Sequence, residues 1–198
     1  MKPEIEAKFL HVEHAVLRAQ LQALDAVQTS PMRLMKRKNY DFPDGRLMVK
    51  RGWARVRDEG DKITLSYKEL HNRELDGTHE VQVVVDDFAA ADALLRNLGL
   101  VATSYQETKR ESWKLDGCEI ELDEWPWAKP YVEIEGLDEK QLRAVAAKLH
   151  LDWQEVLHGS VEIVYRGDYD VTDEEVNKIP VITFNEPIPD WLQKRKRS

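Results

Sequence analysis

Charged residues alternate with apolar ones at the start of the chain, where Glu4, Glu6 and Lys8 are separated by single apolar residues. Side chains two positions apart in a β-strand share one face, so the two carboxylates would lie about 7 Å apart. Carboxylates at this spacing offer the oxygen ligands that hard divalent cations prefer, and an ammonium beside them suits a phosphate. Taken alone, the pattern is more typical of a solvated strand face.

The same alternation recurs in later segments and is sorted by charge. Basic and hydroxyl residues alternate with apolar ones at Arg55 and Arg57 and at Lys62, Thr64, Ser66 and Lys68. Acids alternate with apolar residues at Glu119, Glu121 and Asp123 and at Glu133 and Glu135, and Arg110 and Ser112 precede them in another extended run. A half-buried sheet normally mixes neutral polar residues and both signs on its wet face. The sorting therefore favours a closed barrel with a charged lumen, in which an acidic wall holds metal and a basic wall holds a polyanion. The apolar alternates would pack outward, under helices.

Composition limits the class of protein. The chain has 198 residues, of which 42% are hydrophobic and 33% charged, enough for one substantial core or at most two small domains. The chain leads directly into the first strand, and no run approaches the ~20 apolar residues of a membrane helix. The single cysteine, Cys118, cannot form an internal disulfide. We therefore expect a cytoplasmic protein with no membrane partner.

The charge distribution bears on the partner. A net charge of −8 argues against a nucleic-acid partner. The segment from Arg33 to Arg57 nevertheless holds nine Lys or Arg residues against only Asp41 and Asp44. Such a segment in an acidic protein suits a compact anionic ligand, and the alternative is a basic surface loop.

Periodicity and turn residues predict a protein of the α+β class. The strands expected cover about residues 2–9, 35–42, 53–58, 62–68, 78–85, 105–115, 118–123 and 131–135, and the helices about 12–26, 88–98, 139–149 and 161–166. Asp87 or Asp86, Asp138 and Ser160 are candidate helix caps, and residues 29–31 are expected to form a linker. Glu-Ile-Glu followed by a helix occurs at both 4–6 and 133–135, which hints at two similar halves closing one barrel.

The charged motifs, taken in order, resemble those of CYTH-domain proteins, the triphosphate tunnel metalloenzymes. The matching positions are Glu4-x-Glu6-x-Lys8, Arg55-Val56-Arg57, Lys68, Glu80, Arg110, Asp123 and Glu133-Ile134-Glu135. The resemblance covers about residues 1–166, so we expect one domain there and a C-terminal extension over 167–198. The chain departs from the family pattern at Gln82, where some members have an acid, and at Trp125-Pro126-Trp127, where cyclase-like members often have Leu-Gly.

The resemblance implies an antiparallel eight-stranded β-barrel with flanking helices, whose tunnel binds a triphosphate with Mg²⁺ or Mn²⁺. By position, the phosphate-binding residues would be Lys8, Arg37, Arg55, Arg57, Lys68 and Arg110. The metal ligands would be Glu4, Glu6, Glu80, Asp123, Glu133 and Glu135. Lys68 and Tyr40 are the candidates for assisting proton transfer.

Three functions are compatible with this resemblance. The first is a metal-dependent hydrolase of inorganic tripolyphosphate or of a small organic triphosphate such as ATP or thiamine triphosphate. The second is a class IV-type adenylate cyclase that forms cyclic AMP and pyrophosphate, for which the sequence identifies no purine pocket. The third is a non-catalytic module that binds polyphosphate or a nucleotide. A barrel covered by few helices also fits a homodimer.

Overall fold

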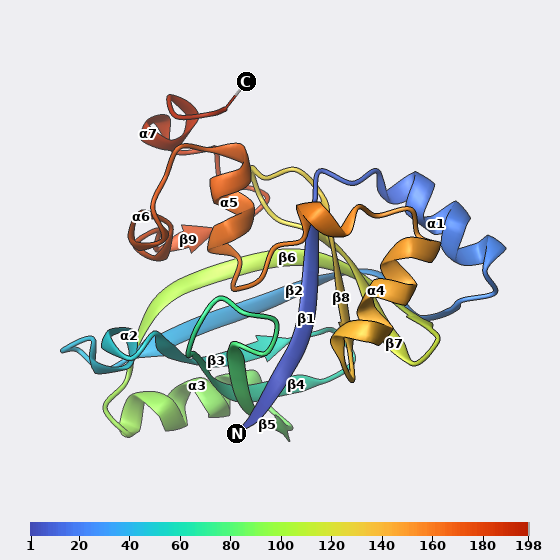
Figure 1. The fold of residues 1–198 in the computed structure, drawn as a ribbon. Coiled ribbons are helices and arrows are strands. Elements are labelled where there is room, and N and C mark those ends of the chain that lie inside the picture. The colour runs from blue at the N-terminus through green and yellow to red at the C-terminus, as the bar shows by residue number, and fades with distance from the viewer. Residues whose placement is uncertain (198) are drawn as a thin grey trace.

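The computed structural model describes residues 1–197, apart from the side chain of Lys2, and shows a β-barrel flanked by helices (Figure 1). The strands are β1 (Lys2–Leu10), β2 (Val27–Asp41), β3 (Gly52–Asp58), β4 (Ile63–Leu70), β5 (Thr78–Val85), β6 (Val101–Leu115), β7 (Cys118–Glu124), β8 (Tyr131–Gly136) and β9 (Val181–Ile182). The helices are α1 (His14–Ala23), α2 (Arg46–Val49), α3 (Phe88–Asn97), α4 (Glu139–Lys148), α5 (Glu162–Asp168), α6 (Asp173–Asn177) and α7 (Asp190–Gln193), with a 3₁₀ turn η1 (Trp153–Glu155).

The first eight strands close into an antiparallel barrel, which confirms the expected fold class. Their order is β2-β3-β4-β5-β1-β8-β7-β6, and β6 pairs back with β2. The seam between β1 and β5 is short, since only residues 2–4 pair with residues 78–80. β9 adds to β6 in parallel. A closed barrel leaves one face of every long strand directed at an enclosed interior.

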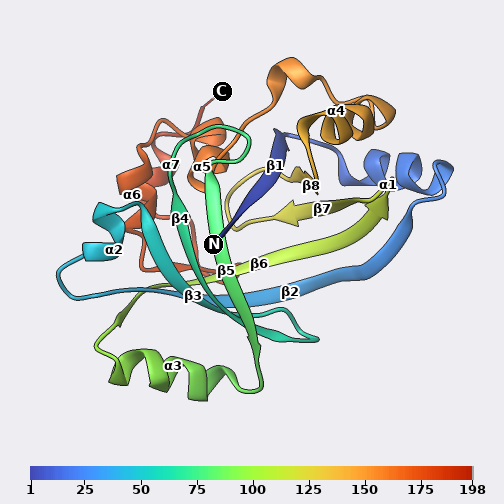
Figure 2. The same cartoon turned by 60° about the horizontal axis from the view of Figure 1, so that its bottom comes forward.

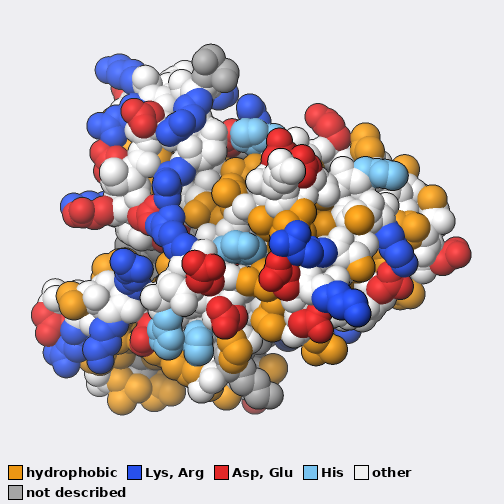
Figure 3. Space-filling model, in the orientation of Figure 1, with side chains coloured by type: hydrophobic (Ala, Val, Ile, Leu, Met, Phe, Trp, Pro, Cys, Tyr) orange, Lys and Arg blue, Asp and Glu red, His pale blue; other side chains and the backbone are white. Residues whose placement is uncertain are grey.

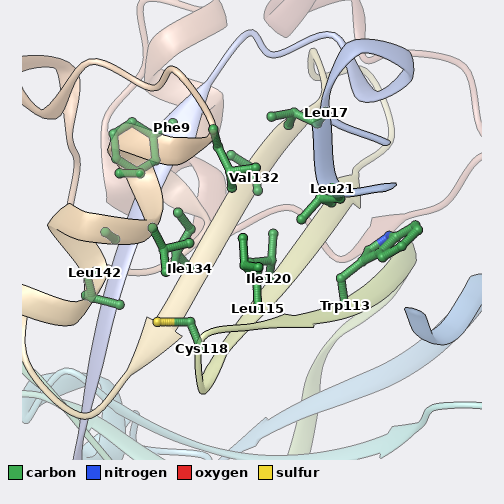
Figure 4. Packing of buried hydrophobic residues seen from close by; sticks show 14 of the residues in the cluster. Phe9, Leu17, Leu21, Trp113, Leu115, Cys118, Ile120, Val132, Ile134 and Leu142 are labelled. Carbon is green, nitrogen blue, oxygen red and sulfur yellow. The ribbon is translucent and has the colours of Figure 1, made fainter. Parts of the chain in front are cut away.

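The outward faces of β1, β7 and β8 form the main hydrophobic core. Ala7 and Phe9 of β1 and Ile120 of β7 pack with Leu142 of α4 and Leu21 of α1. Figure 4 shows Phe9 and Ile120 in one cluster with Leu142 and Leu21, and Figure 2 shows α1 and α4 on the same side of the barrel. Because strand side chains alternate, burying this face commits the intervening charged residues to the lumen.

Two smaller cores complete the packing. α3 covers the outer face of β2 and β3, where Leu95 packs with Tyr40 and Val56. Residues beyond the barrel form a second layer at one end, in which Ile182 and Leu192 pack with aromatic residues of α5 and of the loop after β7. The C-terminal extension is therefore folded against the barrel (Figure 1).

Three local predictions are tested directly. Asp87 and Asp138 accept hydrogen bonds from backbone N–H groups of α3 and α4, as expected of caps. Ser160 is not a cap, because α5 begins after Val161 and no side chain accepts from its first turn. The predicted linker at 29–31 lies within β2, where register shifts flank Ser30. Pro31 is tolerated there because a register shift already interrupts the hydrogen-bond ladder.

Every helix among residues 1–197 is too short or too polar to span a bilayer.

Candidate functional site

The barrel encloses a cavity of about 970 Å³ whose lining is strongly charged. Most of the predicted site residues line it, namely Glu4, Glu6, Lys8, Arg37, Arg55, Arg57, Lys68, Glu80, Arg110, Glu133 and Glu135. On the face of the molecule that Figure 3 shows, basic and acidic side chains are interspersed.

Carboxylates face one another across neighbouring strands on the acidic wall. In the sheet register, Glu135 of β8 lies opposite Glu6 of β1 on one side and Glu119 of β7 on the other. Two residues earlier in β8, on the same face, Glu133 lies opposite Lys8 of β1 on one side and Glu121 of β7 on the other. Like charges directly opposite each other in a sheet are destabilising. This wall therefore carries an excess of negative charge that favours bound cations.

Several of these carboxyl groups have raised pKa values. Burial raises the pKa of Glu4 to about 8, even though Lys68 opposes the shift, and nearby Glu80 adds to it. Burial raises the pKa of Glu121 to about 7, and burial with the charges of Glu133 and Glu6 raises that of Glu135 to about 6. Ionising the wall fully thus costs free energy in the absence of a cation.

Two lysines cross-link the acidic residues. The Lys68 Nζ lies 2.8 Å from a Glu4 carboxylate oxygen and 3.4 Å from one of Glu80. The Lys8 Nζ lies 2.6 Å from Glu6 and 3.1 Å from Glu133. Both lysines are therefore fixed inside the cavity by charge-assisted hydrogen bonds.

Arginines dominate the wall formed by β2 and β3. Arg37 lies directly opposite Arg57, and Arg55 is two positions from Arg57 on the same face. Arg57 is paired with Glu59 at 2.6 Å, and Arg55 reaches Glu80 at 3.3 Å. Among the described residues, the buried Nε atoms of Arg37 and Arg55 have no hydrogen-bond partner.

The arginine wall is short of negative charge. Burial, reinforced by neighbouring Arg57, lowers the pKa of Arg55 to about 10. Burial and the charges of Arg55, Arg57 and Arg110 lower the pKa of Arg37 well below its usual value. Buried cations without counter-ions are costly. A bound anion would supply the missing compensation.

Arg110 and Asp123 form a pair of their own. Asp123 is fully buried and accepts from Arg110 Nε at 2.7 Å and Nη2 at 2.6 Å. Burial alone would lower the pKa of Arg110, but Asp123, Glu121 and Glu133 raise it well above its usual value. Asp123 thus fixes the guanidinium of Arg110 by two hydrogen bonds. Arg110 lines the cavity, whereas Asp123 does not.

Tyr40 is a correction to the predicted site. Its hydroxyl donates to Asp92 of α3 at 2.7 Å, and its ring lies in the core beneath α3, outside the lumen. Arg37 and Tyr40 are three residues apart on one strand, so alternation directs them to opposite faces. Lys38, which is in phase with Tyr40, binds the same aspartate.

Three further lumen residues are not among the predicted phosphate and metal ligands. Arg33, Glu59 and Glu121 line the cavity, and of these only Glu121 belongs to a strand predicted to form the acidic wall. Arg33 donates to Ser112 Oγ at 3.1 Å, and Glu59 pairs with Arg57. Strand phase identifies two of them, because Arg33 is in phase with Arg37 and Glu121 with Asp123. Glu59 lies in a turn, where alternation gives no signal.

The acidic wall carries oxygen donors of the kind that bind divalent cations. Among residues 1–197, no three His, Cys, Asp or Glu side chains converge into a preformed metal cluster. The chemistry nevertheless fits, because the acidic wall supplies only oxygen donors and its raised pKa values reflect charge that a cation would offset. The carboxylates best suited are those of Glu4, Glu6 and Glu135.

Stability of the metal-free protein is expected to fall as pH rises from 5 to 8. The raised pKa values of Glu4, Glu121 and Glu135 mean that the native state retains protons that the unfolded state loses near pH 4.5. Each such proton changes the unfolding free energy by ~1.4 kcal/mol per pH unit, in the destabilising direction. Glu80 has a pKa lowered to about 2 and so changes stability only at lower pH.

Urea denaturation in EDTA at several pH values measures this slope. We expect a loss of at least ~2 kcal/mol between pH 5 and pH 8. A stability that increases over this range would contradict the description of the acidic wall.

Comparison with known proteins adds family information. The sequence profile described as CYTH domain matches residues 2–167. A candidate adenylate cyclase of Vibrio parahaemolyticus superposes with a TM-score of 0.71 at 17% identity, over 83% of this chain and 98% of that one. A candidate adenylyl cyclase of Hippeastrum, described as having a dominant triphosphatase activity, superposes with a TM-score of 0.61 at 17% identity. The match covers 83% of this chain and 95% of that one.

The PH1012 protein of Pyrococcus horikoshii gives a TM-score of 0.64 at 22% identity, over 77% of this chain and 93% of that one. At such identities these structures share the fold alone. A comparison with curated proteins gives no match.

Proposed function

This chain belongs to the CYTH domain family, and on that premise we propose that it is a divalent-metal-dependent hydrolase of inorganic tripolyphosphate or a small organic triphosphate. The observation that carries the proposal is the buried arginine wall, where Arg37 and Arg55 retain unpartnered Nε atoms. Guanidinium groups bind phosphate oxygens through paired N–H donors. A chain of phosphates is long enough to contact several of these guanidinium groups at once, whereas a single phosphate is not.

The basic and acidic residues of the lumen would bind different parts of the metal–triphosphate complex. Lys8, Lys68, Arg55, Arg57 and Arg110 would contact the phosphate oxygens, and Glu4, Glu6, Glu80, Glu133 and Glu135 would face them across the cavity. Carboxylates repel the phosphates directly, so Mg²⁺ or Mn²⁺ between them is required. When bound, the cation would neutralise charge and polarise the phosphoryl group.

The residues of the chain would then position and stabilise the reaction. In hydrolysis, a water oxygen bonds to the terminal phosphorus, the bridging P–O bond breaks, and the released diphosphate takes the bond electrons. Glu121, whose pKa burial raises to about 7 and which is not among the proposed metal ligands, suits the acceptance of the proton from water. Lys68, held between two carboxylates, would stabilise the departing phosphate oxygens.

Product analysis tests the proposal and separates the alternatives. The protein is incubated with Mg²⁺ or Mn²⁺ and with tripolyphosphate, ATP or thiamine triphosphate in turn, and the products are followed by phosphorus NMR. We expect orthophosphate from tripolyphosphate or from an organic triphosphate. Cyclic AMP with pyrophosphate would establish a cyclase instead, and binding without turnover would establish a non-catalytic module.

A further inference from the structure

Trp125 lies beside Arg37 at the edge of the charged lumen. It begins the loop between β7 and β8, lines the cavity and is only 4% exposed. The guanidinium carbon of Arg37 lies 4.7 Å from the centroid of the Trp125 ring. This distance is within the range of a cation–π interaction, for which tryptophan is the strongest aromatic partner.

Arg37 is held differently from most other cations of the lumen. Lys8, Lys68, Arg57 and Arg110 each have a carboxylate oxygen within 2.8 Å. Arg37 has none among the described residues, and its single polar contact is a hydrogen bond from Nη2 to Thr108 Oγ1 at 2.8 Å. An aromatic face attracts a guanidinium without neutralising it, so the remaining N–H donors and the charge stay available.

The ring of Trp125 is itself fixed. Its indole Nε1 donates to the hydroxyl of Tyr131 at 3.1 Å. Tyr165 of α5 packs edge-on against it, with centroids 6.3 Å apart and ring planes at 87°. The Tyr165 hydroxyl donates to the carbonyl of Pro126 at 3.0 Å, which ties the same loop to α5. The surface on which Arg37 rests is therefore rigid.

We propose that Trp125 is a positioning residue for polyphosphate binding, which holds the Arg37 guanidinium against its ring in place of a carboxylate. A carboxylate partner would compete with phosphate for the same donors. The tryptophan orients the side chain and leaves those donors for the ligand. This inference rests on the proposed function and adds to it a residue that acts through Arg37.

A double-mutant cycle on tripolyphosphate binding tests the proposal. Binding is measured by calorimetry for the wild type, Trp125→Leu, Arg37→Met and the double variant. We expect Trp125→Leu to weaken binding by about tenfold to thirtyfold, the scale of a desolvated cation–π contact. In the Arg37→Met background the same change should cost less than about twofold, because the partner has gone.

Two further variants separate positioning from structure. Trp125→Phe keeps an aromatic face and should recover most of the affinity. Trp127→Leu, in the same loop, removes a tryptophan whose indole instead donates to the carbonyl of Glu186, and should leave binding within about twofold. Thermal melting checks that each variant is folded.

The outcomes are distinguishable from failure of the proposed function. Independent, additive losses in the cycle, or no recovery by phenylalanine in a folded protein, would overturn the role of Trp125 while wild-type binding remained. If the wild type binds none of tripolyphosphate, ATP and thiamine triphosphate, both this inference and the proposed function are wrong.

Discussion

Replacing Glu4 with glutamine is expected to reduce phosphate release from tripolyphosphate by about a hundredfold or more while leaving the protein folded. The change removes one of the carboxylates proposed to hold the metal ion, and losses of this order follow from disrupting metal sites. Lys68 would keep its second partner, since Glu80 lies 3.4 Å from its Nζ. The lost acid therefore does not strand a buried cation.

The same substitution should stabilise the metal-free protein at pH 8. Burial raises the pKa of Glu4 to about 8, so ionisation of this group opposes folding there, and a neutral amide avoids that cost. We expect the melting temperature to rise by several degrees, corresponding to ~1–2 kcal/mol. An activity loss coupled to a gain in stability is difficult to explain by misfolding.

Glu124→Gln is the matched control. Glu124 lies on β7 at a position directed away from the lumen and is 3.7 Å from Lys109. It should retain activity within about twofold, as expected for a surface pair. Full activity in a folded Glu4→Gln protein would count against a metal-binding role.

Arg55→Met is expected to weaken binding in proportion to the charge of the ligand. The guanidinium of Arg55 is buried, its nearest carboxylate is 3.3 Å away, and its Nε has no partner among the described residues. Losing a buried, charge-assisted contact costs ~1.5–3 kcal/mol. We therefore expect about a tenfold to hundredfold loss for tripolyphosphate, and progressively smaller losses for pyrophosphate and orthophosphate.

Calorimetry with the three phosphates measures this gradient. Lys36→Met removes the same charge from an exposed position on the neighbouring strand and should change each affinity by less than about twofold. An equal loss for all three ligands would indicate that Arg55 supports the barrel and does not contact the polyphosphate chain.

Most of the lumen was predictable because strand alternation is a strict geometric rule. Once Ala7 and Phe9 are assigned to a buried face, Glu6 and Lys8 must lie on the other. The same rule places Arg55, Arg57, Glu133 and Glu135. The same rule excludes Tyr40 from the lumen, because Tyr40 lies three residues from Arg37 and so faces the other side of the strand.

Alternation alone did not show how the charges pair. Asp123 lies in phase with the acidic wall, yet both of its oxygens bind Arg110, which lies directly opposite it in the hairpin of β6 and β7. Trp125 follows the end of a strand, where no periodicity shows which way a side chain points. Its contact with Arg37 depends on the packing of Tyr165 and the C-terminal layer. The contact between Arg37 and Trp125 joins segments distant in sequence, so the local sequence pattern does not predict it.

A crystal structure of the protein with tripolyphosphate and Mn²⁺ tests the central claim most directly. The account predicts phosphate density inside the barrel in contact with Arg37, Arg55 and Arg57, and an anomalous Mn²⁺ signal on the side of Glu4 and Glu6. Phosphate bound only on the outer surface, or Mn²⁺ bound away from these carboxylates, would contradict it.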